Sequence, residues 1–389
     1  MSVVIAGGGA GGLRMTEALR QRGYTGPVTV VGAEAHLPYN RPGLSKELLR
    51  GDEDGIWLGE PDADVVLADP ATAVDTDRNE LLLNSGRRIA YTDLVLATGA
   101  EARRLPMVAA EAHRIRGLDD AVALREDLRK GGHLLVIGGG FVGCEVASTA
   151  RTMGLGVTVV EVLDHLAEGA LGPAVGAYLS DLHRSHGVRL LCGRTVVSAN
   201  RLTDGTWLVA LADGTELTAD HVVEGSGSIP ATGWLEGGPF TLDSGVVCDD
   251  RGRTNIPHVY ALGDVARWWH PAHARHLRME HWTSVTDQAA VVADTILGTG
   301  DRPLEPVPYF WSDQYGVRLQ AIGLPGRDDE VTVLRNGTRG SLLGCYSRDG
   351  RLTGVVGVRE GKAVARLRLF MRDAPTLADA LAHLSTKEK

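Results

Sequence analysis

The chain has 389 residues, of which 43% are hydrophobic and 23% charged, a balance typical of a globular protein of two or three domains. Its net charge of -9 argues against general nucleic-acid binding. Because no apolar run reaches the roughly 18 residues of a membrane helix and no signal peptide precedes the first strand, we expect a cytoplasmic protein that binds no membrane.

The chain opens with the pattern of a βαβ unit. We expect a strand at residues 2–6, a glycine-rich loop, a helix ending near residue 22 and a second strand at 28–31. The loop reads Gly7-Gly8-Gly9-Ala10-Gly11-Gly12 and fits G-x-G-x-x-G through Gly7, Gly9 and Gly12. In this pattern the first glycine makes the tight turn, the second admits a pyrophosphate and the third lets the helix pack on the strand.

An acidic residue follows this loop at the spacing of a dinucleotide site. Glu34 stands 22 residues after Gly12, at the end of the second strand, where a carboxylate can accept both hydroxyls of a ribose. The N-terminus of the helix offers free N–H groups and partial positive charge to the phosphates. Ala10 and Gly11 complete the loop, so the sequence predicts a first dinucleotide site here.

The same unit recurs after short strands with hairpin signals. A hairpin is expected at residues 81–83 and 89–91, and a strand at 94–97. A strand at 134–137, a glycine loop, a helix ending near residue 153 and a strand at 157–160 then repeat the first unit, 131 residues from Gly7 to Gly138. The residues that repeat its roles are Gly138, Gly140, Phe141, Gly143 and Glu161.

Glu161 favours NADH over NADPH, because a carboxylate would face the 2′-phosphate of NADPH as a like charge. At 4 Å and an effective dielectric near 20, one such pair of unit charges costs about 4 kcal/mol. No arginine directly follows Glu161 to offset that repulsion. A plain solvated strand end is the alternative reading of this residue.

The remaining elements complete three expected regions. A hairpin at 207–211 and 215–217 and a strand at 258–262 precede a helix at about 283–297. From about residue 304 the pattern changes to an α+β domain with an antiparallel sheet. Its strands are expected at 317–322, 331–334, 342–346 and 352–358, and its helices near 361–372 and 376–384.

Two dinucleotide folds in one chain imply two nucleotides, and a flavin with a nicotinamide is the economical pairing. The four cysteines, at 144, 192, 248 and 345, form no CxxC or CxxxxC motif. Their spacing argues against a dithiol active site, a zinc finger or an iron–sulfur cluster, so we expect buried free thiols and no bound metal.

Five further motifs extend along nearly the whole chain in a fixed order. They are Leu37-Pro38-Tyr39-Asn40-Arg41-Pro42-Gly43-Leu44-Ser45-Lys46, Ala97-Thr98-Gly99, Tyr260-Ala261-Leu262-Gly263-Asp264, Glu280-His281-Trp282 and Phe310-Trp311-Ser312-Asp313-Gln314-Tyr315. With these motifs the chain resembles the FAD-dependent, NADH-using ferredoxin reductases of bacterial oxygenase systems.

The resemblance implies an α/β fold with two Rossmann-like dinucleotide-binding domains and a C-terminal α+β domain, in a glutathione-reductase-like architecture. The FAD domain would comprise residues 1–105 and 230–303, the NAD domain residues 106–229, and the C-terminal domain residues 304–389.

The resemblance also implies roles for individual residues. Lys46 would place a cation near flavin N5, and Glu145 would pair with Lys46 and touch the nicotinamide. Trp311 would offer a flat surface near the ring system. Further FAD contacts are expected from Arg41, Thr98, Gly99, Arg116, Gly263, Asp264, Glu280, His281 and Trp282, and Gly227 is expected on the nicotinamide side.

Two departures from the family pattern stand out. The stretch Glu224-Gly225-Ser226-Gly227-Ser228-Ile229-Pro230 is more polar than usual, and Cys144 replaces a larger apolar residue in the second glycine loop. We expect Cys144 to serve packing rather than redox chemistry.

The implied reaction is hydride transfer from NADH to FAD, followed by one-electron transfers to a ferredoxin that supplies an oxygenase. An NADH oxidase, peroxidase or disulfide reductase on the same scaffold is one alternative, although residues 41–46 hold no cysteine. A redox-sensing flavoprotein similar to apoptosis-inducing factor is another.

Overall fold

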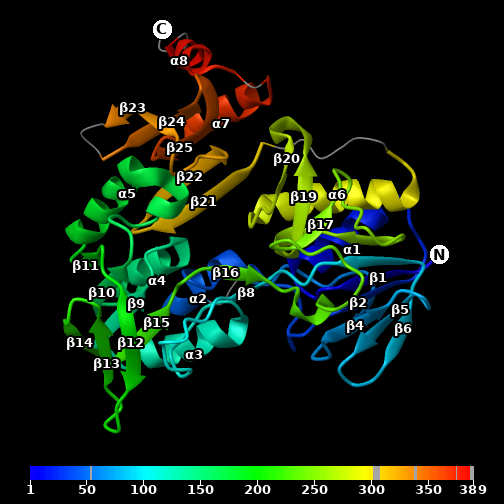
Figure 1. Ribbon diagram of the computed structural model, residues 1–389, viewed down its shortest axis with the longest axis horizontal. Coiled ribbons are helices and arrows are strands. Elements are labelled where there is room, and N and C mark those ends of the chain that lie inside the picture. Colours follow the sequence, from blue (N-terminus) through cyan, green and yellow to red (C-terminus); the bar gives the residue numbers. More distant parts are fainter. Residues whose placement is uncertain (53–54, 301–306, 337–339, 374, 386–389) are drawn as a thin grey trace. The chain divides into compact units, whose positions relative to one another are not determined.

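The computed structural model describes residues 1–52, 55–300, 307–336, 340–373 and 375–385. The chain divides into two compact units (Figure 1). The first unit comprises Met1–Arg41, Asp54–Glu101 and Ser228–Pro306, and the second comprises Pro42–Glu53, Ala102–Gly227 and Val307–Lys389. The segment from Pro42 to Glu53, which we expected in the FAD domain, thus belongs with the second unit.

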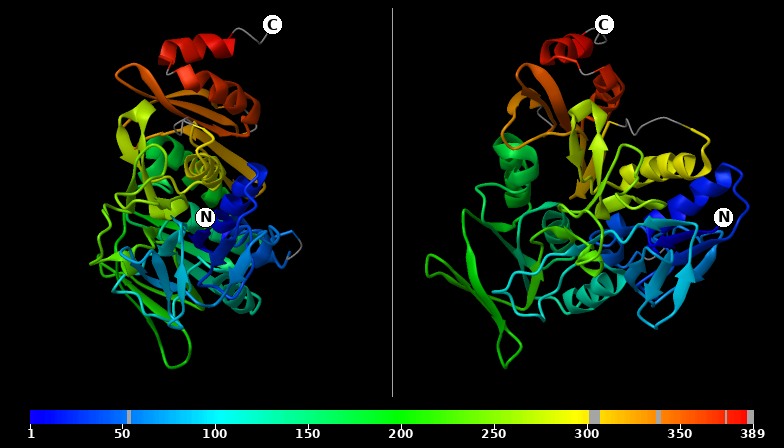
Figure 2. Two further views of the ribbon diagram at one scale, coloured as in Figure 1. Left: turned by 90° about the vertical axis from the view of Figure 1, so that its right-hand side faces the viewer. Right: turned by 45° about the vertical axis from the view of Figure 1, so that its right-hand side comes forward.

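The first unit is built on a parallel five-stranded sheet in the order β18-β7-β1-β2-β3. Its strands are β1 (Val3–Ala6), β2 (Val28–Val31), β3 (Asp64–Val66), β7 (Asp93–Leu96) and β18 (Val259–Ala261). Every residue of β1 and β7 is buried, as expected of parallel strands covered on both faces. Helices α1 (Ala10–Gln21) and α6 (Trp282–Leu297) pack side by side (Figures 1 and 2).

Smaller elements complete the first unit. They are β4 (Ala71–Asp75), β5 (Glu80–Leu83) and β6 (Arg88–Ala90) in one antiparallel sheet, β17 (Val246–Cys248), β19 (Ala266–His270) and β20 (Arg275–Leu277) in another sheet, and the 3-10 turns η2 (Gly233–Leu235), η3 (Gly263–Val265) and η4 (Pro271–His273). Strands β8 (Ala100–Ala102) and β16 (Ser228–Pro230) pair with each other, and each lies at a boundary between the two units along the chain. The 3-10 turn η1 (Arg41–Gly43) lies at another such boundary, after Arg41.

The second unit contains a parallel four-stranded sheet in the order β11-β10-β9-β15. Its strands are β9 (His133–Ile137), β10 (Gly156–Glu161), β11 (Arg189–Cys192) and β15 (His221–Glu224), and the antiparallel strands β12 (Val196–Arg201), β13 (Trp207–Leu211) and β14 (Glu216–Ala219) form a second sheet. Its helices are α2 (Glu47–Arg50), α3 (Leu118–Leu128), α4 (Phe141–Thr152) and α5 (Glu168–Ser185).

The C-terminal part of the second unit is an antiparallel sheet in the order β21-β22-β25-β24-β23. Its strands are β21 (Tyr309–Gln314), β22 (Val317–Gly323), β23 (Glu330–Asn336), β24 (Leu342–Arg348) and β25 (Arg351–Val358), followed by α7 (Gly361–Phe370), the 3-10 turn η5 (Met371–Asp373) and α8 (Leu377–Ser385). None of the helices in the described ranges is long and apolar enough to cross a membrane.

Alternation along these strands gives the C-terminal sheet two buried faces. Ile322, Leu343 and Val355 belong to one hydrophobic cluster with residues of α7 and α8. Their chain neighbours Ala321 and Val356 belong to another cluster, which contains residues of α4 and α5. Since successive side chains of a strand point to opposite faces, the sheet packs on α7 and α8 with one face and on α4 and α5 with the other. This packing explains why both parts form one unit.

Helix α5 contains a break that the sequence did not make obvious. Gly172, with φ of +70°, interrupts the helical backbone directly before Pro173. At this break the buried Tyr346 of β24 donates its hydroxyl to the Leu171 carbonyl at 2.5 Å. The bond ties the C-terminal sheet to α5.

Replacing Tyr346 by Phe should therefore lower the free energy of unfolding by about 1–2 kcal/mol, because a buried carbonyl loses its donor. The matched control is Tyr178→Phe, which removes an exposed hydroxyl bonded to Gly340 and should change stability by less than about 0.5 kcal/mol. Urea unfolding followed by circular dichroism measures both. Equal losses in the two variants would contradict the argument.

Candidate active site

The first glycine loop is closed so tightly that two of its positions admit only glycine. At Gly7, where φ is +146°, a Cβ would lie 2.1 Å from the carbonyl oxygen of Ala97. At Gly12 a Cβ would lie 2.2 Å from the carbonyl oxygen of Gly7. Both distances are far inside van der Waals contact, so these glycines let α1 pack directly on the ends of β1 and β7.

The middle of the same loop is open. A Cβ at Gly9 would meet only the guanidinium of Arg41, at 3.7 Å. Helix α1 starts at Ala10, no side chain caps its N-terminus, and its first turn holds no acid. The free N–H groups and the helix dipole thus suit an anion, and the loop fits the pyrophosphate of a dinucleotide.

Several polar side chains surround Glu34 beside this loop. Its carboxylate accepts hydrogen bonds from the Tyr39 hydroxyl and from the Arg41 guanidinium, whose carbon lies 5.1 Å from the Tyr39 ring centre. Burial opposes the charge of Arg41, but Tyr39, Glu34 and Asp264 outweigh it and raise the pKa of Arg41. The structure therefore brings Glu34, Arg41 and Asp264, which were expected at one FAD site, together in the first unit.

Two turns beside the sheet complete the FAD-side residues. Thr98 donates its hydroxyl to the Ala231 carbonyl at 3.0 Å, and Gly99, with φ of +75°, accepts the Ala231 N–H at 3.0 Å. Gly263, also at φ of +75°, donates its N–H to the buried Gln288 side chain at 2.7 Å. Both turns hold their backbone in the left-handed region, which favours glycine.

The Glu280-His281-Trp282 motif leads into α6. Glu280 accepts the Ser228 hydroxyl at 2.6 Å and pairs with Arg278. Burial lowers the pKa of His281, so its ring is held neutral at pH 7. Trp282 is the first residue of α6 and is half-buried.

The second glycine loop reproduces the geometry of the first. A Cβ at Gly138 would lie 2.5 Å from the Gly225 carbonyl oxygen, and a Cβ at Gly143 would lie 2.2 Å from the Gly138 carbonyl oxygen. A Cβ at Gly140 would have its nearest neighbour 4.0 Å away, so this position is open as Gly9 is. Helix α4 begins at Phe141 with neither a side-chain cap nor an acid in its first turn. This loop, too, fits a pyrophosphate.

Glu161 ends β10 and holds the second loop in place. Its carboxylate accepts the Gly139 N–H at 2.5 Å and the Leu163 N–H at 2.8 Å. Each carboxylate oxygen retains a further lone pair that could accept a ribose hydroxyl.

Three residues near the second loop, Gly227, Arg116 and Glu224, take part in hydrogen bonds within the second unit. Gly227 accepts the Arg103 N–H at 2.9 Å, and Arg116 precedes α3 with its own N–H bonded to Asp120. The unexpected polar residue Glu224 is buried and accepts the Leu105 N–H at 2.5 Å and the Ser226 hydroxyl at 3.0 Å. The polar stretch after β15 therefore fastens the chain near residues 103–105 to the end of β15.

The expected ion pair between Lys46 and Glu145 is present and buried. The Lys46 ammonium lies 2.8 Å from the Glu145 carboxylate, and both residues are 6% exposed. Lys46 also donates to the Pro42 carbonyl at 2.8 Å. Lys46 immediately precedes α2, whose Leu49 packs in the same cluster as Leu124 of α3, so this segment is anchored to the second unit.

Two hydroxyls complete the surroundings of the Glu145 carboxylate. Ser45 donates to one oxygen at 2.6 Å, and Ser312 of β21 donates to the other at 2.7 Å. Both serines are buried. The buried carboxylate thus has one cation and two hydroxyl donors as partners.

Strand β21 carries the Phe310-to-Gln314 motif with a period of two. Phe310 meets Phe141 edge-on at 5.1 Å between ring centres, and Ser312 reaches Glu145 from the same face. Trp311 points to the opposite face and stacks with Tyr309 at 5.9 Å. The face that carries Phe310 and Ser312 contacts α4.

Sequence reasoning missed several residues of this site. Ser45 and Ser312 lay inside quoted motifs without an assigned role, and Gln314 and His183 were not singled out for chemistry. Their sequence signal was weak, because Ser312 and Gln314 lie on a strand, His183 lies on a helix and Ser45 lies in a turn. That signal names a partner only when the fold is known.

The cysteines are unsuited to redox catalysis. Cys144 and Cys248 are buried, and burial raises the pKa of each thiol. Burial also raises the pKa of Cys345 to about 11. Cys144 donates to the Gly139 carbonyl at 3.3 Å, a packing role as expected. A thiol with a raised pKa supplies little thiolate at pH 7.

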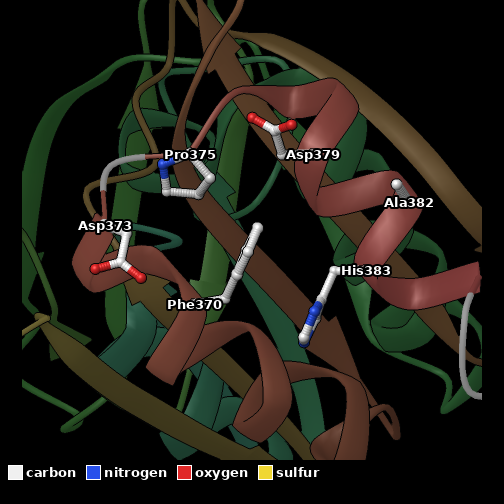
Figure 3. A pocket seen from close by; sticks show the side chains of 6 residues that line it. All are labelled: Phe370, Asp373, Pro375, Asp379, Ala382 and His383. Carbon is white, nitrogen blue, oxygen red and sulfur yellow. The ribbon is translucent and has the colours of Figure 1, made fainter.

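A shallow pocket lies apart from these residues, between η5 and α8 (Figure 3). Inside it the rings of Phe370 and His383 stack at 4.6 Å. Its lining consists of Phe370, Asp373, Pro375, Asp379, Ala382 and His383. Because none of the expected site residues lines it, the pocket is not part of the candidate site.

Comparison with known proteins identifies the family. The model of the pyridine nucleotide-disulphide oxidoreductases matches residues 1–289, and that of the reductase C-terminal domain matches residues 309–387. The chain belongs to this oxidoreductase family, whose members use FAD and NAD(H). The fold class expected from the sequence is thereby confirmed.

Individual relatives show which members of this family the chain is similar to. The chain is 34% identical to the ferredoxin–NAD(+) reductase component of the anthranilate 1,2-dioxygenase system of Burkholderia cepacia, over 98% of each chain. It superposes on the putidaredoxin reductase of a covalent complex with putidaredoxin with a TM-score of 0.92, 29% identity and 99% coverage of both chains. It also superposes on a ferredoxin reductase from Rhodopseudomonas palustris with a TM-score of 0.90 and 32% identity, and the match covers 99% of this chain and 100% of the other. The resemblance to oxygenase-system ferredoxin reductases is confirmed.

Replacing Gly12 by Ala should abolish FAD binding, because the new Cβ would collide with the Gly7 carbonyl oxygen and push α1 away from β1. The matched control is Gly233→Ala in the same unit, where a Cβ would meet nothing within 4 Å. The absorbance ratio of bound flavin to protein in the purified variants measures the difference. Full FAD occupancy in the Gly12 variant would contradict the assignment of this loop.

Proposed function

We propose that this member of the family is a flavoprotein ferredoxin reductase, which takes electrons from NADH through FAD and passes them to a ferredoxin. The observation that carries the proposal is the repetition of one glycine loop, with the same close approach of 2.2 Å from the third glycine's Cβ position to the first glycine's carbonyl oxygen. Two such loops give the chain one site for each of two dinucleotides.

The chain's own residues have distinct tasks in this reaction. Bound FAD supplies the step between two-electron and one-electron transfer. Gly7, Gly9 and Gly12 hold its diphosphate, and Glu34 with Arg41 orients its adenosine end. Lys46 stabilises the negative charge of the reduced ring, and Glu145 keeps that lysine in position.

The second dinucleotide is proposed to be NADH. Gly138, Gly140 and Gly143 form its phosphate site, and Glu161 repels the extra phosphate of NADPH. Trp311, half-buried on β21, is proposed to lie against the flavin ring system.

The proposed partner is a ferredoxin, which in turn supplies an oxygenase. Residues 304–389 carry 13 Lys+Arg against 10 Asp+Glu, a net +3, whereas residues 1–303 carry 27 against 39, a net -12. A basic C-terminal part on an acidic body suits an acidic partner that docks by charge. We place the reaction in the cytoplasm, where NADH is produced.

A steady-state assay tests this function. With NADH and cytochrome c as the final acceptor, we expect rapid reduction only when a ferredoxin is added, and rates that fall as salt screens the docking charges. Rapid peroxide or oxygen consumption without ferredoxin would instead favour the oxidase or peroxidase alternative. A persistent NADH complex with negligible turnover would favour a redox-sensing flavoprotein.

Replacing Glu161 by Gln should raise the ratio of kcat/KM for NADPH to that for NADH by at least about tenfold, because the like-charge repulsion disappears. A Gln oxygen still accepts one of the two N–H groups that Glu161 holds. The control is Glu126→Gln, which removes an exposed charge from α3 of the same unit and should leave the ratio unchanged. An unchanged ratio in the Glu161 variant would mean that Glu161 only holds the glycine loop in place and does not select between the two nucleotides.

A further inference from the structure

A row of hydrogen-bonded side chains, Ser312, Gln314, His183 and Tyr315, leads to Glu145 and has no part in the proposed reaction. Gln314 donates its side-chain N–H to Ser312 at 3.1 Å, and Ser312 donates to Glu145 at 2.7 Å. On its other side, the Gln314 carbonyl oxygen lies 2.9 Å from Nε2 of His183. Gln314 is 2% exposed and His183 is fully buried.

The chemistry of each group fixes the direction of every bond in this row. The Gln314 oxygen can only accept, so His183 must carry its proton on Nε2. Nδ1 of His183 then accepts from the Tyr315 hydroxyl, 3.0 Å away. Burial lowers the pKa of His183 to about 4 and raises the pKa of Tyr315, so the ring is neutral and the phenol protonated at pH 7.

All bonds from Tyr315 to Glu145 therefore point the same way, toward the carboxylate. Such a row polarises each member and strengthens the last donor, the Ser312 hydroxyl. It does not conduct protons readily, because an amide in the middle would have to change its bonding to pass one on. The row is suited to positioning.

The local structure explains how the row is assembled. Ser312 and Gln314 lie two residues apart on β21 and so share one face, while His183 comes from the last turn of α5. Tyr315 follows β21, and its N–H is held by the Ser148 hydroxyl of α4 at 2.7 Å. His186, exposed at the end of α5, stacks on the Tyr315 ring at 3.8 Å and closes the outer end.

We propose that Gln314 is a positioning residue that, supported by His183, fixes the Ser312 hydroxyl on Glu145 and so holds the Lys46–Glu145 pair in its reactive geometry. Without Gln314 the Ser312 hydroxyl is free to rotate away, and the Glu145 carboxylate loses one of its two hydroxyl donors. This inference rests on the proposed role of the pair in flavin reduction.

A double-mutant cycle separates positioning from general structure. Gln314→Met keeps the length of the side chain and removes both hydrogen bonds, and we expect flavin reduction by NADH in stopped flow to slow about tenfold. In a Glu145→Gln background the same change should slow it less than about twofold, because the group it positions is already altered. Equal losses in both backgrounds, or no loss in the first, would overturn the proposal.

Ser312→Ala serves as the second variant, since removing one hydroxyl disturbs folding least. It should slow flavin reduction as Gln314→Met does, and adding Gln314→Met to it should change little; additive losses would overturn the proposal. The control is Gln320→Met on the neighbouring strand β22, which removes a side-chain hydrogen bond to Tyr309 of β21 and should leave the rate unchanged.

A readout independent of turnover is the ring of His183. In the FAD-loaded protein labelled with nitrogen-15 histidine, NMR should show a neutral ring with its proton on Nε2, and this preference should be lost in Gln314→Met. A ring protonated on Nδ1 would overturn the proposed bond directions. If wild-type protein showed these signals but no ferredoxin-dependent turnover, the proposed function would fail while the hydrogen-bond row stood.

Discussion

The buried ion pair between Lys46 and Glu145 is the constraint on which the site depends. Taking a lysine and a glutamate out of water costs several kcal/mol per ion, and attraction alone offsets this only when the remaining bonding capacity is also used. Here Ser45, Ser312 and the Pro42 carbonyl supply the missing partners. Because the pair and these partners together come from three segments distant in sequence, the pair is tolerated only when η1, α4 and β21 are all in place.

This requirement accounts for the way the chain is divided. The Pro42–Glu53 segment follows the FAD-side residues in sequence, yet it packs with the second unit because its lysine must reach α4 and its Leu49 must reach α3. The C-terminal sheet is bound to the same unit by Ser312 and by the face that packs on α4 and α5. The C-terminal sheet is therefore part of the surroundings of the Lys46–Glu145 pair.

The elements that the sequence predicted best are those whose structure is determined by residues close to one another in the sequence. Both glycine loops and their flanking strands follow from the glycine spacing and from short apolar runs beside it. Similar runs predicted the C-terminal strands β22 to β25, whereas β21 was not expected. Helix α5 was not predicted, because Gly172 and Pro173 are residue types typical of turns and Gly172 does interrupt the helical backbone. The partners of Glu145 were missed because they lie 100 and 167 residues away, and no local pattern encodes such a meeting.

The family takes its name from disulfide chemistry, but the segment that follows the first βαβ unit of this chain carries a buried lysine and no cysteine. The segment from Arg41 to Lys46 contains no cysteine, and the three buried thiols elsewhere have raised pKa values. A disulfide beside the flavin would accept a pair of electrons as its S–S bond breaks to give two thiols, whereas a lysine accepts none. Electrons on the flavin must then leave for an external acceptor, and the buried Lys46–Glu145 pair suits a flavin that serves a separate one-electron carrier.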